Sequence, residues 1–554
     1  MKILTLHCDY IKFKPTKEAI KEAEETDKKL IEVKECLVVF TAVEQQDSEN
    51  SSAIIKKFTE NVTEIAGQVK CKTLVLYPYA HLSSKLAKPT LAEEILKKAE
   101  QQLKKNFKVT RAPFGWYKEF ELKCKGHPLS ELSREITAEE KEEKAEKKIL
   151  KIVINKSKLS ENDHRILGQK LDLFSFNETA PGMVFWHPKG LVLRNLLIEF
   201  WRKEHDKAGY QEILTPQIMS KKLWKLSGHW DHYKNAMFFT SAGKEEFAIK
   251  PMNCPGAMLL FKETPRSYKE LPLRFCELGI VHRLELSGVL AGMLRVIQIT
   301  QDDAHIFCQD DQVEQEVIKI IELIDKFYKV FGFSYHVELS TKPKDHIGTD
   351  DEWKKAENSL ENALKKLKLK FKVNPGEGAF YGPKIDFHIK DSQGRTWQCA
   401  TIQLDFAMPQ RFSLEYTSQD NKKHVPRVIH RTIYGSLERF IGILTEHYKG
   451  QFPLWLSPTQ VRVLSFTARN VKAAEKIFKL LKENFRVELD IRDESVPYKI
   501  REAELQKIPY IIVIGDKEEK NNTLAVRARG KNPEFGVKPK NFIERLKKEV
   551  EEKK

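Results

Sequence analysis

The chain has 554 residues, enough for several domains that each bury their own core, and 41% of them are hydrophobic, as in ordinary globular proteins. Its formal net charge of +16 favours a polyanionic partner such as nucleic acid, although lysine enrichment can also serve solubility. The eight cysteines form no CxxC pair, which argues against a disulfide framework or a compact zinc finger. Without a signal-peptide pattern or the ~18 consecutive apolar residues of a membrane span, the sequence predicts a soluble cytoplasmic protein.

The first 135 residues alternate between strand and helix patterns and predict a compact α/β domain. Strands are expected at 3–11, 35–43, 72–82, 107–115 and 118–124, and helices at 51–66 and 91–105. His81 lies at the end of the third predicted strand. A lone histidine there is more often a hydrogen-bonding structural residue than a catalytic one, so the pattern leaves the role of this domain open.

A charged linker is predicted at 136–160. Its TAEEKEEKAEKK run at 137–148 is typical of a solvated linker or a short exposed helix. The ILKIVIN segment at 149–155 could add a strand to either neighbouring domain.

The second large domain is placed at 161–456. A long helix at 191–207 carries an apolar face formed by Leu193, Leu197, Phe200 and Trp201, and a strand ending at Pro216 follows it. This helix could lie in the core of a monomer or form an interface between two copies. Further on, 227–238 is expected to be a loop held by packing, and Cys254 is expected in a tight Pro-Gly turn.

The stretch 281–308 predicts a strand, a loop and a returning strand. The expected parts are an extended entry to Arg283, a turn with Ser287, Gly288 and Gly292, and a return from Met293 to Ile299. Arg283 and Arg295 flank the loop, so both guanidinium groups could point at one site, and such a group fits phosphate oxygens. A surface hairpin with solvated charges would show the same local pattern.

Two more strands, at 377–389 and 395–406, are predicted to pair. Their polar residues could share one face or rim: Tyr381, Lys384, Asp386, Gln398, Thr401 and Gln403. A strand that ends at Ser436 then leads into a helix at 437–448. The last domain, 457–554, has a β-α-β-α-β order followed by a strand and a basic helix, which predicts a mostly parallel sheet with helices on both faces.

Spacing alone predicts no metal site. Cys254, His305 and His430 are far apart in the sequence, and for such residues a buried thiol and two hydrogen-bonded imidazoles are the usual outcome.

The hairpin resembles motif 2 of the class II aminoacyl-tRNA synthetases, and its tail TQDDAHIFC is similar to the threonyl enzymes. The helix and strand that end at Pro216 resemble motif 1, the dimer interface of that class, and IHRTIYGS with the helix after it resembles motif 3. The segments HCDY, YPYAHLSS, APFGWYK and KGHPLSELSR resemble the editing domain of archaeal threonyl-tRNA synthetases, which is similar in fold to D-aminoacyl-tRNA deacylases. The HxxxH and CxxxH patterns of bacterial threonyl enzymes are absent.

This resemblance implies a multidomain α/β and α+β protein. The expected parts are an α/β editing domain at 1–135, a class II catalytic domain with an antiparallel sheet at 161–456, and an α/β anticodon-binding domain at 457–554.

It also implies roles for individual residues. Arg283 would hold the α-phosphate of ATP, Arg439 would cover its γ-phosphate and adenine side, and His229 would assist aminoacyl transfer to tRNA. Positions matched to the family's ATP site are Glu285, Arg295 and Gln398, and those matched to its threonine site are Asp303, Tyr381 and Gln403. One Zn²⁺ per subunit would bind Cys254, His305 and His430 with one coordination position open, and Mg²⁺ would accompany ATP.

The two outer domains carry the remaining expected sites. The editing residues are His81, Tyr117, Lys118 and Glu131, and the anticodon contacts are Asp493, Glu518 and Arg527. Asp493 departs from the asparagine of the bacterial enzymes.

Three functions are compatible with this resemblance: an active threonyl enzyme with proofreading, a catalytically inactive paralogue acting as an RNA-binding regulator, and a deacylase acting in trans. The second and third predict loss of Arg283, Arg439 or the three metal-matched residues, yet all are present. The predicted function is therefore attachment of L-threonine to tRNA(Thr) through threonyl-adenylate, by a homodimer that also hydrolyses seryl-tRNA(Thr).

Overall fold

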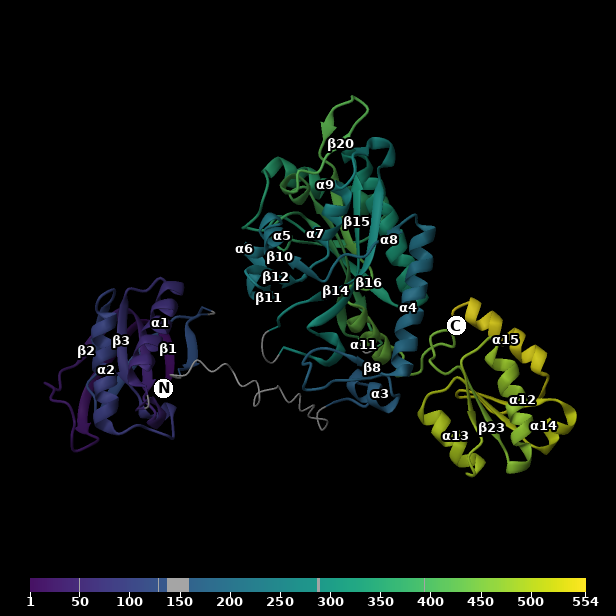
Figure 1. The fold of residues 1–554 in the computed structure, drawn as a ribbon, viewed down its shortest axis with the longest axis horizontal. Helices are drawn as coiled ribbons and strands as arrows, with labels where there is room; N and C mark the ends of the chain where they lie inside the picture. Colours follow the sequence, from purple (N-terminus) through teal and green to yellow (C-terminus); the bar gives the residue numbers. More distant parts are fainter. Residues whose placement is uncertain (49, 128, 137–158, 286–288, 393) are drawn as a thin grey trace. The chain divides into compact units, whose positions relative to one another are not determined.

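The computed structural model describes residues 1–48, 50–127, 129–136, 159–285, 289–392 and 394–554. The chain forms two compact units, Met1–Lys148 and Ile149–Lys554 (Figure 1). The predicted charged run, the strand at 149–155 and the turn residues Ser287 and Gly288 lie outside the described residues. None of the described helices is both long and apolar enough to cross a membrane.

A six-stranded mixed sheet forms the first unit. Its strands run in the order β4-β3-β2-β1-β5, and β6 also pairs with β1. Their bounds are β1 Lys2–Glu18, β2 Ile31–Ala42, β3 Thr73–Pro78, β4 Lys108–Arg111, β5 Trp116–Cys124 and β6 Glu131–Glu135. Helices α1, Ser51–Gln68, and α2, Pro89–Leu103, pack on one face. This architecture confirms the predicted α/β fold.

Alternation along β2 divides its side chains between two cores. Leu37 and Val39 pack with residues of α1 and α2, whereas Val38 and Phe40 belong to a cluster on the opposite face. The third strand is shorter than predicted: it ends at Pro78, and His81 lies in the 3-10 turn Ala80–Leu82.

An eight-stranded sheet forms the centre of the second unit. Its order is β17-β16-β18-β19-β22-β15-β14-β9, and all neighbours are antiparallel except the two end pairs. The strands are β9 Gln211–Glu212, β14 Leu273–His282, β15 Gln298–Cys308, β16 Ser334–Ser340, β17 Phe371–Asn374, β18 Lys384–Lys390, β19 Thr396–Asp405 and β22 Arg427–Thr432. This sheet confirms the antiparallel sheet predicted for the second domain.

Four long helices pack against one face of this sheet. The helices that form the large hydrophobic core with this sheet are α4 Pro188–Lys207, α8 Val313–Val330, α9 Asp350–Lys366 and α11 Leu437–His447. Along β15, Ala304 and Ile306 belong to this core, so Asp303 and His305 face the opposite side. The strand pleat therefore places the polar residues together on the other face.

The predicted apolar face of α4 is used within the subunit. Leu193, Leu197, Phe200 and Trp201 are all buried in the same core as α8. An interface between copies would have to use other residues. The strand expected to end at Pro216 is reduced to β9 at the edge of the sheet.

The strand-loop-strand prediction is confirmed, with a correction to its return. β14 pairs with β15 from Leu273–Phe307 to His282–Gln298. Strand β15 begins at Gln298 rather than at Met293, because Gly292 to Leu294 form a 3-10 turn, η6. Gly292 has a φ of 57°, a conformation that favours glycine.

Two predicted irregular segments are helical. Within 227–238, α6 spans His229–Tyr233 and a 3-10 turn spans Lys234–Ala236. Cys254 begins helix α7, Cys254–Lys262, instead of lying in a turn. The Pro-Gly pair belongs to the first turn of this helix, where proline is tolerated because its missing N–H would have no partner there.

The C-terminal sheet confirms the predicted order and the helices on both faces. Its order is β24-β23-β25-β26-β27, with β24, β23 and β25 parallel. β26 and β27 are added antiparallel, so the sheet is mixed and not mostly parallel as predicted. The strands are β23 Val461–Ser465, β24 Val487–Asp490, β25 Tyr510–Ile514, β26 Leu524–Ala528 and β27 Glu534–Val537, and the helices are α12 Val471–Lys482, α13 Val496–Leu505, α14 Asp516–Asn521 and α15 Pro539–Glu551. Val463 packs with α12 and α15, whereas Leu464 packs with Ala503 of α13. Helix α14 and strand β27 were not predicted.

Candidate active site and metal-ligand triad

Cys254, His305 and His430 meet on the polar face of the eight-stranded sheet. His305 and His430 are direct partners on β15 and β22, with ring centroids 4.9 Å apart, and Cys254 comes from the start of α7. All three are buried, and their ligand atoms lie within 4.8 Å of one another. The fold thus joins three residues that the sequence keeps apart.

The donor atoms of this triad fit a divalent metal such as zinc. His305 Nε2 is buried and has no hydrogen-bond partner among the described residues. His430 Nε2 lies 2.9 Å from Asp405 Oδ2, so its Nδ1 is left for a metal, and a carboxylate behind a ligating imidazole is a common arrangement. Burial lowers the pKa of His305 and raises that of the Cys254 thiol, so a neutral imidazole stands beside a thiol that a cation would deprotonate.

The residues matched to the family's threonine site lie around this triad. Asp303 Oδ2 lies 3.9 Å from His305 Nε2, the Tyr381 ring lies 5.7 Å from the His430 ring, and Gln403 is the direct partner of His430 on β19. Burial raises the pKa of Asp303 to about 6.

Asn253 was not predicted and belongs to this pocket. Its Nδ2 donates to Asp303 Oδ2 at 3.4 Å, and its buried Oδ1 has no partner among the described residues. A Cβ at Gly279 would lie 2.1 Å from that oxygen, so the glycine makes room for the amide. The place of Asn253 in this pocket follows only from the close approach of β14 to the start of α7.

His229 also lies beside the triad. It is buried, with Nδ1 2.8 Å from Ser227 Oγ, and its Nε2 lies 3.0 Å from Met252 Sδ and 3.9 Å from Cys254 Sγ.

The two arginines matched to the family's ATP site, Arg283 and Arg439, donate hydrogen bonds to backbone carbonyls. Arg283 Nε donates to Pro251 O at 3.2 Å, directly before the helix that begins with Cys254. Arg439 Nε donates to Leu294 O at 2.9 Å, so the η6 turn positions the motif 3 arginine. Arg295, on the other side of the loop, forms an ion pair with Glu285 at 2.8 Å.

A polar rim runs along β18 and β19, as predicted. Asp386 Oδ1 accepts hydrogen bonds from Gln398 Nε2 at 2.6 Å and from Thr401 Oγ1 at 2.9 Å, and Lys384 pairs with Asp386 at 2.7 Å.

Asp302 fixes the turn that precedes Arg439, a role that the sequence pattern does not indicate. Its buried carboxylate accepts from the backbone N–H groups of Ile433, Tyr434 and Gly435 at 2.8–3.0 Å. Burial raises the pKa of Asp302 to about 6, although these donors favour the charged form.

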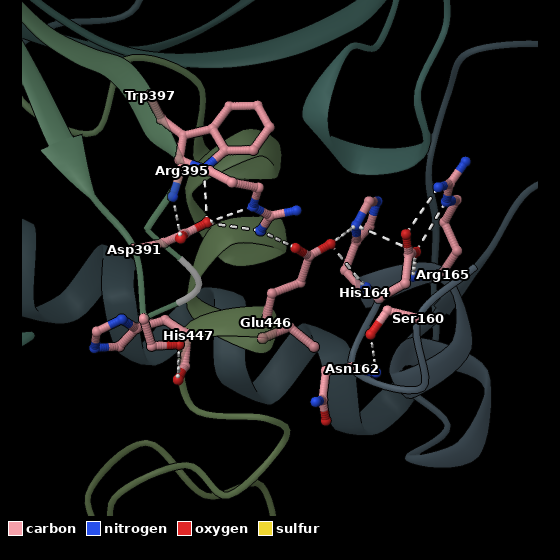
Figure 2. A network of polar contacts seen from close by, with 12 residues as sticks. Ser160, Asn162, His164, Arg165, Asp391, Arg395, Trp397, Glu446 and His447 are labelled. Atoms are coloured by element: carbon pink, nitrogen blue, oxygen red, sulfur yellow. Dashed lines mark hydrogen bonds and ion pairs between the residues drawn. The ribbon is translucent and has the colours of Figure 1, made fainter. Parts of the chain in front are cut away.

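A second unpredicted network joins four segments that are far apart in the sequence (Figure 2). His164 Nδ1 lies 2.6 Å from Glu446 Oε1 on α11, and His164 Nε2 accepts from Met293 N of the η6 turn at 3.0 Å. Arg395 forms ion pairs with Glu446 and Asp391. Burial alone would raise the pKa of Glu446, but its hydrogen bonds with His164 and Arg395 lower it overall.

The first unit has a cavity of about 390 Å³ that contains three of the four residues matched to editing. His81, Tyr117 and Lys118 line it, whereas Glu131 lies on β6 and is not a lining residue. Lys118 Nζ donates to Pro113 O and Trp116 O, each at 3.0 Å. Burial lowers the pKa of Lys118 to about 8.

The three residues matched to the family's anticodon contacts are spread over the C-terminal domain. Asp493 follows β24, whereas Glu518 lies in α14 and accepts from Gly515 N at 3.1 Å. Arg527 is paired with Ile511 near the start of β25 and lines a hollow of about 390 Å³ with other basic residues. Those are Lys507, Arg529 and Lys531.

Comparison with known proteins places these parts in one class. Residues 1–136 match the archaea-specific editing domain of threonyl-tRNA synthetase, 237–448 match the class II tRNA synthetase core for glycine, histidine, proline, serine and threonine, and 460–549 match an anticodon-binding domain. The eight-stranded sheet with its motif 2 hairpin and motif 3 helix is thus a class II aminoacyl-tRNA synthetase core.

Relatives identify the family. The RNA binding domain of threonyl-tRNA synthetase from Cryptosporidium parvum is 42% identical, with a TM-score of 0.68 over 70% of this chain and 98% of that structure. ThrRS-1 from Aeropyrum pernix is 30% identical, with a TM-score of 0.63 over 71% of this chain and 97% of that structure. The chain belongs to the threonyl-tRNA synthetase family.

Curated proteins of similar sequence carry the name of the same family. Threonine–tRNA ligases of Caldanaerobacter subterraneus and Acetivibrio thermocellus are 59% and 56% identical over 390 and 393 residues, or 70% and 71% of this chain. The chain spans about three fifths of the length of these relatives, 60% and 62%.

Proposed function

We propose that this protein attaches L-threonine to tRNA(Thr) at the expense of ATP and hydrolyses mischarged seryl-tRNA(Thr). The observation that carries the synthetic part is the buried convergence of Cys254, His305 and His430 beside Asp303. Exchange of ³²P-pyrophosphate into ATP tests it: the reaction should depend on threonine, be weaker with serine and be absent with valine. Equal exchange with valine would contradict the proposal.

The arginines suit the activation step. The threonine carboxylate attacks the α-phosphorus of ATP, and pyrophosphate leaves as the adenylate forms. This step needs charge neutralisation and in-line placement more than proton transfer, so fixed guanidinium groups with Mg²⁺ on the phosphates are appropriate. Arg283 would hold the α-phosphate and Arg439 the γ-phosphate and adenine side, with Glu285, Arg295 and Gln398 completing the ATP site.

Selection of threonine would use the triad. An apolar pocket distinguishes threonine from valine by only ~1–3 kcal/mol. A bound Zn²⁺ with an open position would supply a Lewis-acid contact for the amine and hydroxyl of threonine. Asp303 would accept a hydrogen bond from the amine, Tyr381 and Gln403 would close the pocket, and His229 would assist transfer to tRNA.

Serine offers the same amine and hydroxyl and lacks one methyl group. The missing methyl weakens binding by only ~1 kcal/mol, so seryl-tRNA(Thr) would be formed. The cavity lined by His81, Tyr117 and Lys118 is the proposed second sieve, with Glu131 as a further expected member. No observation favours a catalytically inactive paralogue, because the residues that such a protein would lose are in place.

The proposed assembly is a cytoplasmic homodimer. The apolar residues exposed near the motif 1 segment, Leu191, Leu214 and Ile218, would lie in its interface, and Leu214 is 80% exposed. All eight cysteines are free thiols, in keeping with a reducing compartment.

Replacing Arg527 with alanine is expected to raise the KM for tRNA about tenfold and to leave threonine activation unchanged. A guanidinium contact to an unstacked base contributes ~1–3 kcal/mol. The measurement is aminoacylation at varied tRNA concentration, with Lys531→Ala as a control for loss of one charge in the same hollow. An unchanged KM in Arg527→Ala would remove this residue from the anticodon site; Asp493 and Glu518 can be tested in the same way.

Replacing His164 with alanine is expected to raise the KM for ATP by about 10- to 100-fold, because small misplacements of a positioned group have effects of that size. Without His164 the η6 turn loses its bond at Met293 N, and Leu294 O no longer holds Arg439 firmly. The KM for threonine should change little. His164→Gln keeps a donor and an acceptor and should recover part of the loss; parallel rises in both KM values would indicate general unfolding instead.

A further inference from the structure

A second group of metal-ligating side chains lies on the eight-stranded sheet, apart from the Cys254 triad. His336 and Glu338 are on β16, and His388 is on the adjacent strand β18. Their ligand atoms lie within 4.8 Å of one another, and the group shares no residue with the Cys254 triad.

The strand register brings the two imidazoles face to face. His336 and His388 are direct partners, and their rings are 4.8 Å apart and within 9° of parallel. Glu338 is two residues along the same strand face, and its Oε2 lies 3.7 Å from His388 Nε2. The alternate residues Val337 and Phe387 are buried in the core, so the three ligating side chains share the opposite face.

Neighbouring residues hold this group, which lies beside the polar rim of β18 and β19, because His388 is the direct partner of Gln398. Asn374 of β17 donates from Nδ2 to Glu338 Oε2 at 3.3 Å, which orients the carboxylate as outer partners of metal ligands do. Asp386, two residues before His388, is engaged by Gln398, Thr401 and Lys384.

We propose that His336, Glu338 and His388 form a second divalent metal site, with Zn²⁺ as the ligand chemistry they fit best. Two imidazoles and one carboxylate favour Zn²⁺, Cu²⁺ or Ni²⁺ over Mg²⁺ or Ca²⁺, which prefer oxygen ligands. His336 is exposed and the other two residues are half-buried, so water can complete the coordination.

To close this site, the two imidazole rings must turn out of their near-parallel stack so that their in-plane lone pairs converge on one ion. Zinc bonds of about 2.0–2.1 Å in tetrahedral geometry place ligand atoms about 3.4 Å apart, against the present limit of 4.8 Å. The bound cation would link β16 to β18 and neutralise Glu338. Because these ligands are open to solvent, this site should fill after the buried triad.

The test is calorimetric titration of the full-length protein with Zn²⁺ after one equivalent has been bound. A further single equivalent is expected to bind, and zinc should raise the melting temperature as it does so. In His388→Ala and in Glu338→Gln, binding of this equivalent should weaken more than about 100-fold, beyond the effect of losing an outer partner. Threonine activation should be unchanged in both variants.

His424→Ala is the matched control. His424 is an exposed imidazole with a single carboxylate partner, Asp420 at 2.9 Å, and belongs to no metal-ligating group among the described residues. This variant should bind zinc like the parent. The Cys254→Ala variant should lose one equivalent and keep the other, which separates this site from the proposed active-site metal. Absence of a second equivalent in the parent, or its persistence in both His388→Ala and Glu338→Gln, would overturn the proposal.

Discussion

Cys254→Ala is expected to lower threonine-dependent ATP–pyrophosphate exchange by about 10³-fold or more and to abolish zinc binding at the triad. A metal contact supplies several kcal/mol, and each 1.36 kcal/mol is tenfold in rate. His305 and His430 alone would leave a site with two protein ligands. Pyrophosphate exchange and elemental analysis of the purified protein measure the two effects.

Cys276→Ala is the matched control for this substitution. Cys276 is also a buried thiol of the same unit, but it faces the large apolar core and is not in the triad. The Cys276→Ala variant should be less stable, because the substitution leaves a cavity, but it should retain metal and activity. Full activity of a zinc-free preparation, or equal loss in both variants, would contradict the role proposed for Cys254.

Lys118→Met is expected to slow hydrolysis of seryl-tRNA(Thr) by about 10²–10³-fold while leaving threonine activation intact, a size typical of a group that assists proton transfer or orients water. Lys118 is the ammonium group at the cavity, and two of its three donors are used by backbone carbonyls. The third donor can hold the attacking water or the terminal ribose. Lys123→Met, on the same strand but exposed, should have no such effect.

The pH dependence of editing gives a second measure of Lys118. Burial lowers the pKa of Lys118 from 10.5 to about 8, so the ammonium form predominates below pH 8 and is lost above it. If this form orients water or ribose, the enzymatic rate of deacylation should fall as the pH rises through about 8. That decline should be absent in Lys118→Met. A rate that rises through pH 8 only in the parent would show instead that the neutral amine acts as a base.

The local sequence pattern was sufficient to predict the helices and strands with strong hydrophobic periodicity. The helix that begins at Leu437 and the paired strands β14 and β15 follow from spacing of apolar residues, because each buries one face against a neighbour. The order of the C-terminal strands predicted its sheet and helix placement for the same reason. Element ends are less well predicted: the pattern places Met293 in a strand, although it lies within the 3-10 turn Gly292–Leu294.

The sequence by itself determined which residue types are available and, through its resemblance to a known family, which positions to inspect. The tertiary structure decided which of them meet. Cys254 reaches His305 and His430 only because α7 packs against the sheet where β15 and β22 are in register. Asn253, Asp302 and His164 carry no local signal, because hydrogen bonds between distant segments depend on the packing of whole elements rather than on spacing along the chain.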